Sequence, residues 1–265
     1  MSWPERIICM TEETVETLYL LGEQDRIVGI SGFTVRPPEA RKEKPKVSAF
    51  TSAKIPKILD LKPDLVLGFS DLQADIAAEL IREGVEVYIL NHRNVNGILR
   101  MIRSLGRLVD AKEKADALAS IYEQRIAEIK RITNTWEVKP TVYFEEWYDP
   151  IISGIGWVSE LIEIAGGIDC YAENAMHQGG KERIIADPMD VVSRAPDIII
   201  GSWCGKRFHP HKVGEREGWA NVPAVLNEEV YEIKSAVILQ PGPAALTEGL
   251  DQLFEILNRW HKKQP

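Results

Sequence analysis

The chain has 265 residues, of which 45% are hydrophobic and 27% charged, and it carries a formal net charge of −8. This composition fits a globular protein with one large or two modest domains. The acidic balance argues against nucleic-acid binding, which needs a basic stripe on the surface. No run of residues approaches the roughly 20 apolar residues of a membrane-spanning helix.

The first residues, from Met1 to Arg6, lack the apolar stretch and the small-residue cleavage site of a signal peptide. The three cysteines are an odd number, so at least one of them has no intramolecular disulfide partner. We therefore expect a cytoplasmic protein for the chain as given, and a periplasmic one if a leader has been removed.

Strand and helix signals alternate through the first half of the chain, in the rhythm of a parallel α/β sheet. The run at 65–68 is apolar throughout, as expected of a parallel strand that is buried on both faces. In chain order we expect strands at 6–10, 27–30, 47–50, 65–68 and 85–90, a helix from Thr11 that stops at Gly22, and a helix at 73–82.

The stretch from 95 to 136 contains no convincing strand. Apolar residues within 111–133 recur at steps of three and four, which predicts one long amphipathic helix. A helix of about 22 residues is roughly 33 Å long. It therefore has the length of a strut between two lobes.

The second half begins again with strand and helix signals. We expect strands at 141–145, 198–201 and 230–233, and helices at 157–165, 187–194 and 246–261. The stretches 32–46, 169–184 and 204–222 have no assigned element. Long loops in compact domains are commonly functional, and ligands of parallel sheets gather at the carboxyl ends of the strands.

One pattern occurs twice, half a chain apart. Residues 53–70 and 186–203 each show a short helix, a Pro-Asp turn, a buried strand and a glycine near the strand's end. Such a repeat implies two similar lobes with a cleft for a ligand. The predicted fold class is α/β, two lobes with mostly parallel sheets flanked by helices, joined by one long α-helix. The predicted domains are an N-terminal lobe at 1–108, a linking helix at 109–136 and a C-terminal lobe at 137–265.

Five short motifs follow one another along the whole chain. They are Arg26-Ile-Val-Gly-Ile-Ser, Leu61-Lys-Pro-Asp-Leu-Val-Leu, Glu163-Ile-Ala-Gly-Gly, Gly218-Trp-Ala-Asn-Val-Pro-Ala-Val and Gln240-Pro-Gly-Pro-Ala. In this order they resemble the periplasmic binding proteins for vitamin B12 and ferric siderophores. The resemblance implies two α/β lobes joined by a long helix, which hold one ligand between them with little closure.

The resemblance also implies docking onto an ABC permease through one surface glutamate in each lobe. Aligned on the Pro-Asp motifs, these positions are Pro56 and Met189, and neither is acidic. Asp60, Asp190 or Glu182 could supply the charge instead. We expect a monomer, and favour a cytosolic relative that binds the ligand without serving a permease.

Aromatic residues gather where the cleft of the family would lie, after the ends of predicted strands. Flat ligands such as a corrin ring bury well against aromatic faces. The alternative is that about half of these rings belong to the cores of the lobes. The candidates are Phe33, Phe50 and Phe69 in the first half, and Trp147, Tyr148, Trp157 and Trp203 in the second.

Basic residues could hold the polar or anionic arms of the ligand, with arginine as a bidentate fork. The candidates are Arg36, Lys206 and Arg207, and the alternative is a solvated loop. Glu13 is a candidate polar anchor, although a helix N-terminus already favours an acidic residue. Cys204 and His209 are weak metal candidates, because a dedicated zinc site needs three or four ligands.

These residues predict a binding protein with no catalytic residues and no required cofactor. The first choice of ligand is a corrinoid, either cobalamin or cobinamide, because of the aromatic richness. A ferric siderophore is the second choice, favoured if the basic residues face the cleft, and haem is the third. The alternatives from other classes are a corrinoid- or chelate-processing enzyme and a cytosolic ligand sensor.

Overall fold

The computed structural model describes residues 3–264, so the first two residues of the N-terminal segment lie outside it. The chain forms two compact units, Met1–His92 with Asn96–Tyr122, and Arg93–Val95 with Glu123–Pro265. Helix α6 (Lys112–Thr133) contributes its first half to one unit and its second half to the other. Within residues 3–264, no helix is both long and apolar enough to cross a bilayer.

The N-terminal unit is built on a five-stranded sheet in the order β3-β2-β1-β4-β5, and all of its pairs are parallel. The strands are β1 (Ile7–Cys9), β2 (Ile27–Ser31), β3 (Lys46–Ser48), β4 (Leu65–Phe69) and β5 (Val87–Leu90). The helices are α1 (Glu12–Leu20), α2 (Pro38–Glu43), α3 (Ile55–Asp60), α4 (Ala74–Arg82) and α5 (Val95–Leu108). Helix α2 lies in a stretch for which no element was predicted.

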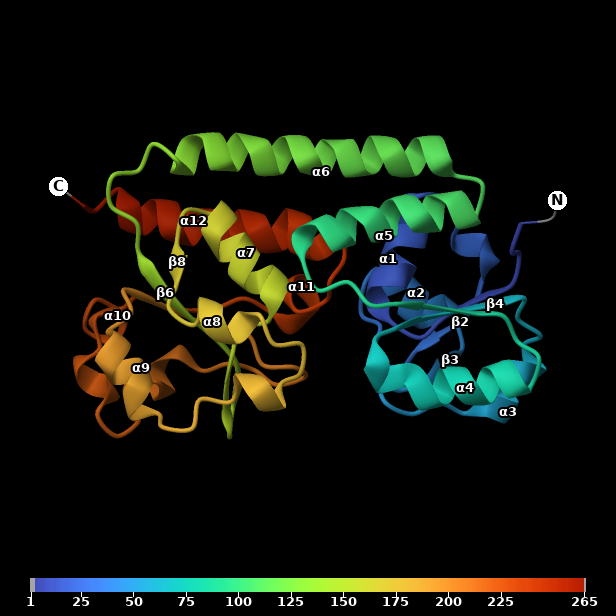
Figure 1. The fold of residues 1–265 in the computed structure, drawn as a ribbon, viewed down its shortest axis with the longest axis horizontal. Coiled ribbons are helices and arrows are strands. Elements are labelled where there is room, and N and C mark those ends of the chain that lie inside the picture. The colour runs from blue at the N-terminus through green and yellow to red at the C-terminus, as the bar shows by residue number, and fades with distance from the viewer. Residues whose placement is uncertain (1–2, 265) are drawn as a thin grey trace. The chain divides into compact units, whose positions relative to one another are not determined.

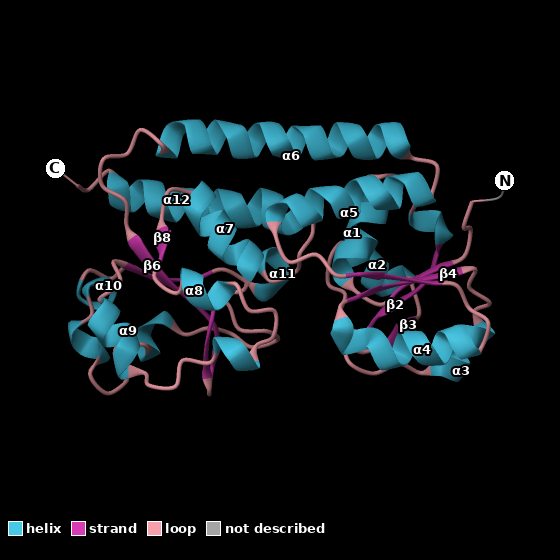
Figure 2. Ribbon diagram, viewed as in Figure 1, coloured by secondary structure: helices cyan, strands magenta, loops and turns pink. Residues whose placement is uncertain are grey.

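Helices cover both faces of this sheet (Figures 1 and 2). Ile58 of α3 and Leu80 of α4 pack in one core cluster with Ile8 and Val66 of the sheet, whereas α1 and α5 lie over the other face. Every residue of β4 is buried. This explains why its sequence is an unbroken apolar run rather than an alternating one.

The C-terminal unit has a sheet in the order β10-β9-β6-β7, and β8 pairs with β6. The strands are β6 (Thr141–Tyr148), β7 (Ile151–Ser153), β8 (Ile168–Asp169), β9 (Ile198–Gly201) and β10 (Val230–Glu232). Only the β6–β7 pair is antiparallel among the described strand pairs. Strand β7 was not predicted, because three residues directly after a turn give no periodic signal.

The helices of this unit are α7 (Gly156–Ile164), α8 (Ala172–Ala175), α9 (Met189–Arg194), α10 (Pro223–Leu226), α11 (Ser235–Ile238) and α12 (Leu250–His261). Val191 of α9 and Ala224 of α10 share a core cluster with Tyr143 of β6 and Ile199 of β9. The repeated motif forms α3 and β4 in one unit and α9 and β9 in the other. The predicted fold class, two mostly parallel sheets flanked by helices with a long connecting helix, is confirmed.

Candidate functional site

Two neighbouring parallel strands of the C-terminal unit end at the same edge of its sheet. In the β6–β9 pair Glu145 lies opposite Gly201, so the last residues of β6 are brought beside the residues that follow β9. The rings of Tyr148 and Trp203 have centroids 4.5 Å apart, and those of Trp147 and Tyr148 are 5.2 Å apart. We call Trp147, Tyr148 and Trp203 the aromatic shelf. All three are candidates predicted from the sequence, and the structure places them side by side.

The loop that follows β9 lays basic side chains beside this shelf. They line a pocket of about 490 Å³, which we call the basic pocket. Lys206 Nζ donates a hydrogen bond of 2.7 Å to the Tyr148 hydroxyl, and it lies 5.1 Å from the ring centroid of Trp147. The pocket is lined by Tyr148, Trp203, Lys206, Arg207, His209, Lys212 and Arg216.

A buried carboxylate connects the shelf to the pocket. Glu145 has no exposed side-chain area, and its oxygens accept from Arg216 Nη1 at 2.6 Å and Nη2 at 2.8 Å. The same carboxylate accepts from Trp203 Nε1 at 3.1 Å and from the Tyr143 hydroxyl at 3.0 Å. Burial, with the adjacent Glu145 charge, raises the pKa of Tyr143 well above its usual range. Glu145 therefore fixes the Trp203 ring and neutralises Arg216.

A close approach at the end of β9 sets the path of the loop. A Cβ added at Gly201 would lie 2.0 Å from the ring of Phe208, which is fully buried. Phe208 also packs edge-on against Trp203, with ring centroids 5.1 Å apart. Because the glycine leaves room for Phe208, the loop can fold back and present the basic residues to the shelf.

Substituting Gly201 with alanine is expected to lower the free energy of unfolding by about 2 kcal/mol, because the added methyl group must displace a buried ring. Urea denaturation measures this. In a Phe208→Ala background, the same substitution should cost much less, because the ring that it displaces is gone. Equal costs in the two backgrounds would contradict the packing described here.

The N-terminal unit carries its candidate aromatic residues at the carboxyl edge of its own sheet. Phe33 follows β2 and is 65% exposed, and Phe50 follows β3 and is 36% exposed. Phe69 ends β4, but it is buried against the His92 ring. Buried Gln73 connects two segments at this edge. Its Nε2 donates to the Phe50 carbonyl at 2.8 Å, and its Oε1 accepts from the Phe69 backbone amide at 3.0 Å.

Three carboxylates lie together on α1 of this unit. One oxygen of Glu12 accepts from the backbone amides of Val35 and Arg36, and Glu16 pairs with the Arg36 guanidinium at 3.1 Å. Glu13 accepts from the Thr11 hydroxyl and is almost fully buried. Burial raises the pKa of Glu12 from 4.5 to about 7, against the lowering effect of its backbone donors. Burial raises the pKa of Glu13 to about 7 in the same way.

These carboxyl groups predict that stability falls as the pH rises. Their native pKa lies above the unfolded value, so the folded chain keeps protons that the unfolded chain releases between pH 4.5 and about 7. The stability is fully present below this window and is lost through it, by up to about 3 kcal/mol for one carboxyl group. Glu12→Gln should flatten the profile of urea midpoints against pH, whereas the exposed control Glu5→Gln should not. Superimposable profiles of Glu12→Gln and the unchanged protein would contradict this assignment.

Three of the predicted ligand contacts are buried side chains. Trp157 is 2% exposed and its Nε1 donates to the Ile238 carbonyl at 2.9 Å, so it lacks the open ring face that stacking needs. Phe69 and Glu13 are likewise enclosed within the N-terminal unit. Each of the three lies at one end of an element whose inner face is core, and sequence position alone does not distinguish that face from an exposed one.

The weak metal candidates are not brought into a ligand set. Cys204 is exposed, and the His209 ring lies 5.7 Å from that of His211. Within residues 3–264, no three His, Cys, Asp or Glu side chains come together as metal ligands would.

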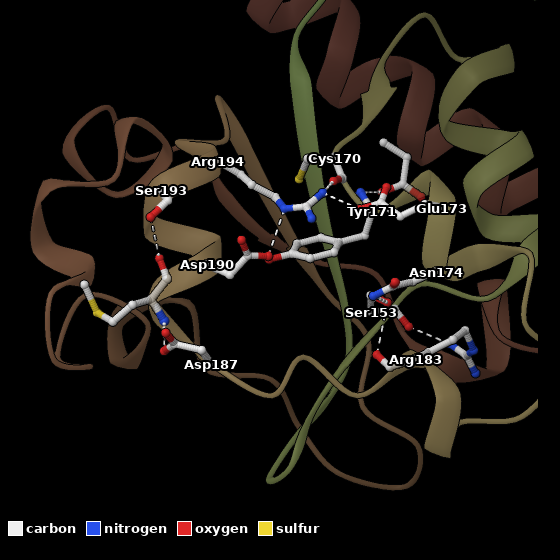
Figure 3. A network of polar contacts seen from close by, with 12 residues as sticks. Ser153, Cys170, Tyr171, Glu173, Asn174, Arg183, Asp187, Asp190, Ser193 and Arg194 are labelled. Carbon is white, nitrogen blue, oxygen red and sulfur yellow. Dashed lines mark hydrogen bonds and ion pairs between the residues drawn. The ribbon is translucent and has the colours of Figure 1, made fainter.

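The two positions aligned with docking glutamates lie on equivalent surface helices. Pro56 is exposed near the start of α3, and Met189 is exposed at the start of α9. Asp190 is engaged elsewhere, since it accepts from the Tyr171 hydroxyl at 2.8 Å and pairs with Arg194 at 2.9 Å (Figure 3). The Arg194 guanidinium also lies 4.0 Å from the centroid of the Tyr171 ring. Asp190 therefore has two partners within its own unit, while 44% of its side chain remains exposed.

Comparison with known proteins places this arrangement in a family. The sequence matches the family described as periplasmic binding protein over residues 7–237. The chain belongs to this family. Among its relatives is a vitamin B12-binding protein of Vibrio parahaemolyticus, 27% identical over 96% of this chain and 91% of that protein. An uncharacterised ABC transporter substrate-binding lipoprotein of Bacillus subtilis is also 27% identical, over 95% of this chain and 79% of that protein.

The fold of this family member is shared with solved structures. The vitamin B12-binding protein of Vibrio cholerae superimposes with a TM-score of 0.79 at 22% identity, covering 98% of this chain and 99% of that one. Arg216, Lys212 and Gln73 were not predicted from the sequence. Their positions depend on how loops fold back onto strand ends, and only the nearby Gly218-Trp219 pair signalled a structured loop.

Proposed function

We propose that the chain reversibly captures one metal-chelate ligand, with the aromatic shelf as its stacking surface. The pairing of Tyr148 with Trp203 at the ends of β6 and β9 carries this proposal, in a chain that belongs to a family of binding proteins. A corrinoid is the first choice, supported by the Vibrio relative named for vitamin B12. A ferric siderophore or haem is the second, supported by the basic residues beside the shelf.

The relative named as an ABC transporter substrate-binding lipoprotein supports a permease as the partner of the ligand-bound form, and a location outside the cytoplasmic membrane. The exposed Pro56 and Met189 would then meet the permease through contacts other than ion pairs. Binding of the purified protein to an ABC permease for metal chelates, reconstituted in nanodiscs, tests whether docking occurs. We expect this binding to be insensitive to salt concentration.

Ligand capture is tested by co-elution on a sizing column with cyanocobalamin, dicyanocobinamide, a ferrichrome-type siderophore and haem. Trp203→Ala is expected to weaken binding of the retained compound about tenfold, because removing one stacked ring costs about 1–1.5 kcal/mol. Quenching of tryptophan fluorescence measures the affinity. Trp3→Ala is the matched control, since this residue is exposed at the N-terminal end.

The outcomes separate the classes of function. One compound retained at a single equivalent and recovered unchanged supports a binding protein. A compound recovered chemically altered would instead indicate a processing enzyme. If none of the four co-elutes and fluorescence does not change, the proposal of chelate capture is wrong.

A further inference from the structure

We infer that Arg183 is the positioning residue of the aromatic shelf, because it holds a bulge of one residue in β6 that turns Tyr148 toward Trp203. Its effect on the ligand rests on the proposed function, in which the shelf is the stacking surface. Three observations carry the inference: the register of β6 against β7, the contacts of one buried arginine, and the contacts of the Trp203 ring.

The pairing of β6 with β7 contains one extra residue on β6. Glu145 lies opposite Ser153. Tyr148, three residues further along β6, lies opposite Ile151, which is only two residues before Ser153. The register shifts directly after Glu145, so Glu146 is the residue without a counterpart on β7. Such a bulge bends the strand, and bulges beside functional sites re-aim the side chains that follow them.

The bulge places Tyr148 on the same face of the sheet as Glu145. Side chains alternate between the faces of a regular strand, so residues three apart would point to opposite faces. Directly opposed residues of an antiparallel pair share a face, and Ile151 and Ser153 share one because they are two apart. Tyr148 and Glu145 therefore share it as well. The contacts of Trp203 agree, since its Nε1 donates to Glu145 at 3.1 Å and its ring centroid lies 4.5 Å from that of Tyr148.

Arg183 binds the extra residue and the partner strand at once. Its Nη1 and Nη2 donate to the two carboxylate oxygens of Glu146 at 2.5 and 3.1 Å, and Nη1 also donates to the Ser153 carbonyl at 2.5 Å. The Ser153 hydroxyl donates in return to the Arg183 carbonyl at 3.2 Å (Figure 3). The loop then pairs with β7, since the Ile185 amide donates to the Ile151 carbonyl at 2.9 Å. Arg183 therefore fixes Glu146 where β6 has one residue too many.

Stability alone does not explain why this arginine is buried. Arg183 is 1% exposed. Replacing a buried ion pair by apolar residues of similar volume is often neutral or stabilising, and the best-attested use of such a pair is to fix a register. The alternative here is a hairpin without the bulge, in which Glu146 pairs with Ile152 and the extra residue moves into the turn. Tyr148 would then point away from Trp203.

The test removes the arginine and then removes the extra residue. In ligand-free protein with labelled tyrosine and tryptophan rings, NOE cross-peaks between Tyr148 and Trp203 report that the two rings lie side by side. Arg183→Met is expected to lose these cross-peaks, because Glu146 is then free to leave the bulge. Deleting Glu146 in the Arg183→Met background is expected to restore them, because the shortened strand keeps Tyr148 opposite Ile151 without any bulge.

Ligand affinity should follow the same pattern. For the compound retained on the sizing column, Arg183→Met is expected to weaken binding about tenfold, as Trp203→Ala does, because one ring leaves the stacking surface. The deletion of Glu146 should recover most of that loss. Lys181→Met is the matched control, since Lys181 is an exposed cation of the same short helix and should leave both affinity and cross-peaks unchanged.

Two results would overturn the inference. Unchanged cross-peaks in Arg183→Met would show that the bulge does not depend on the arginine. Cross-peaks that stay lost in the double variant, when its far-UV circular dichroism matches that of the unchanged protein, would show that Arg183 supports packing rather than register. These spectra are recorded without ligand, so a failure of all four compounds to bind would overturn the proposed function and leave the role of Arg183 in placing Tyr148 standing.

Milder variants keep the test decisive if Arg183→Met or the deletion does not fold. Arg183→Lys keeps the charge but loses the planar fork, and Glu146→Gln keeps the shape but loses the charge. Each is expected to lower the intensity of the cross-peaks between Tyr148 and Trp203. Unchanged intensity in both variants would equally overturn the inference.

Discussion

Glu145→Leu is expected to lower the free energy of unfolding of the C-terminal unit by about 3 kcal/mol. The substitution leaves the Arg216 guanidinium without its partner in a largely enclosed place, and breaking a buried ion pair from one side costs roughly 3–5 kcal/mol. The lower end applies because 23% of the Arg216 side chain remains exposed. The Tyr143 hydroxyl and Trp203 Nε1 also lose their acceptor.

Urea denaturation followed by circular dichroism measures this loss. Arg216→Met is the companion variant, and the double variant Glu145→Leu/Arg216→Met should recover part of the stability, because neither charge is then left alone. Additive losses in the double variant would mean that the two groups do not act as a pair. Glu145→Gln, which keeps one acceptor oxygen, should fall between the unchanged protein and Glu145→Leu.

Trp219→Ala is expected to cost about 4 kcal/mol, the largest effect of a single substitution that we predict. Trp219 is fully buried and packs edge-on against Tyr143, with ring centroids 5.9 Å apart. The Arg216 guanidinium lies 4.6 Å from the centroid of its ring. Removing the indole therefore opens a cavity in the core and deprives Arg216 of the surface on which it rests.

The same denaturation experiment checks this value. Trp219→Phe should cost about half as much, since a six-membered ring refills most of the volume. Trp3→Ala is the control for loss of an indole from an exposed site, and surface substitutions usually change stability by less than about 0.5 kcal/mol. A loss below about 1 kcal/mol for Trp219→Ala would show that the loop from Cys204 to Val222 is not packed as described.

The sequence predicted the sheets better than the site. Buried parallel strands such as β4 and β9 are apolar runs between turn residues, so their composition and length locate them in the sequence. The sequence identified Trp203 and Tyr148 as candidates but did not predict that their rings lie side by side. That placement depends on two adjacent parallel strands ending at the same edge of the sheet.

Burial explains what the sequence could not reveal. Trp157 and Trp203 are both tryptophans at the end of an element, yet one packs inside its unit and the other lies beside a pocket. The difference is set by which face each backbone presents to the core. The contribution of Arg216 was missed because it depends on the loop turning back over Gly201, which is a tertiary rather than a periodic feature.

The residues bound to the buried Glu145 and the exposed basic residues of the loop should respond differently to substitution. Arg216 and Trp203 are both tied to a buried carboxylate, so changes there disturb the folded state together with any ligand. Lys206, Arg207 and Lys212 are exposed side chains on the loop and are tied to no carboxylate among residues 3–264. If the basic pocket holds the ligand, as proposed above, substitutions at these three positions would change ligand preference while the scaffold that supports them stays intact.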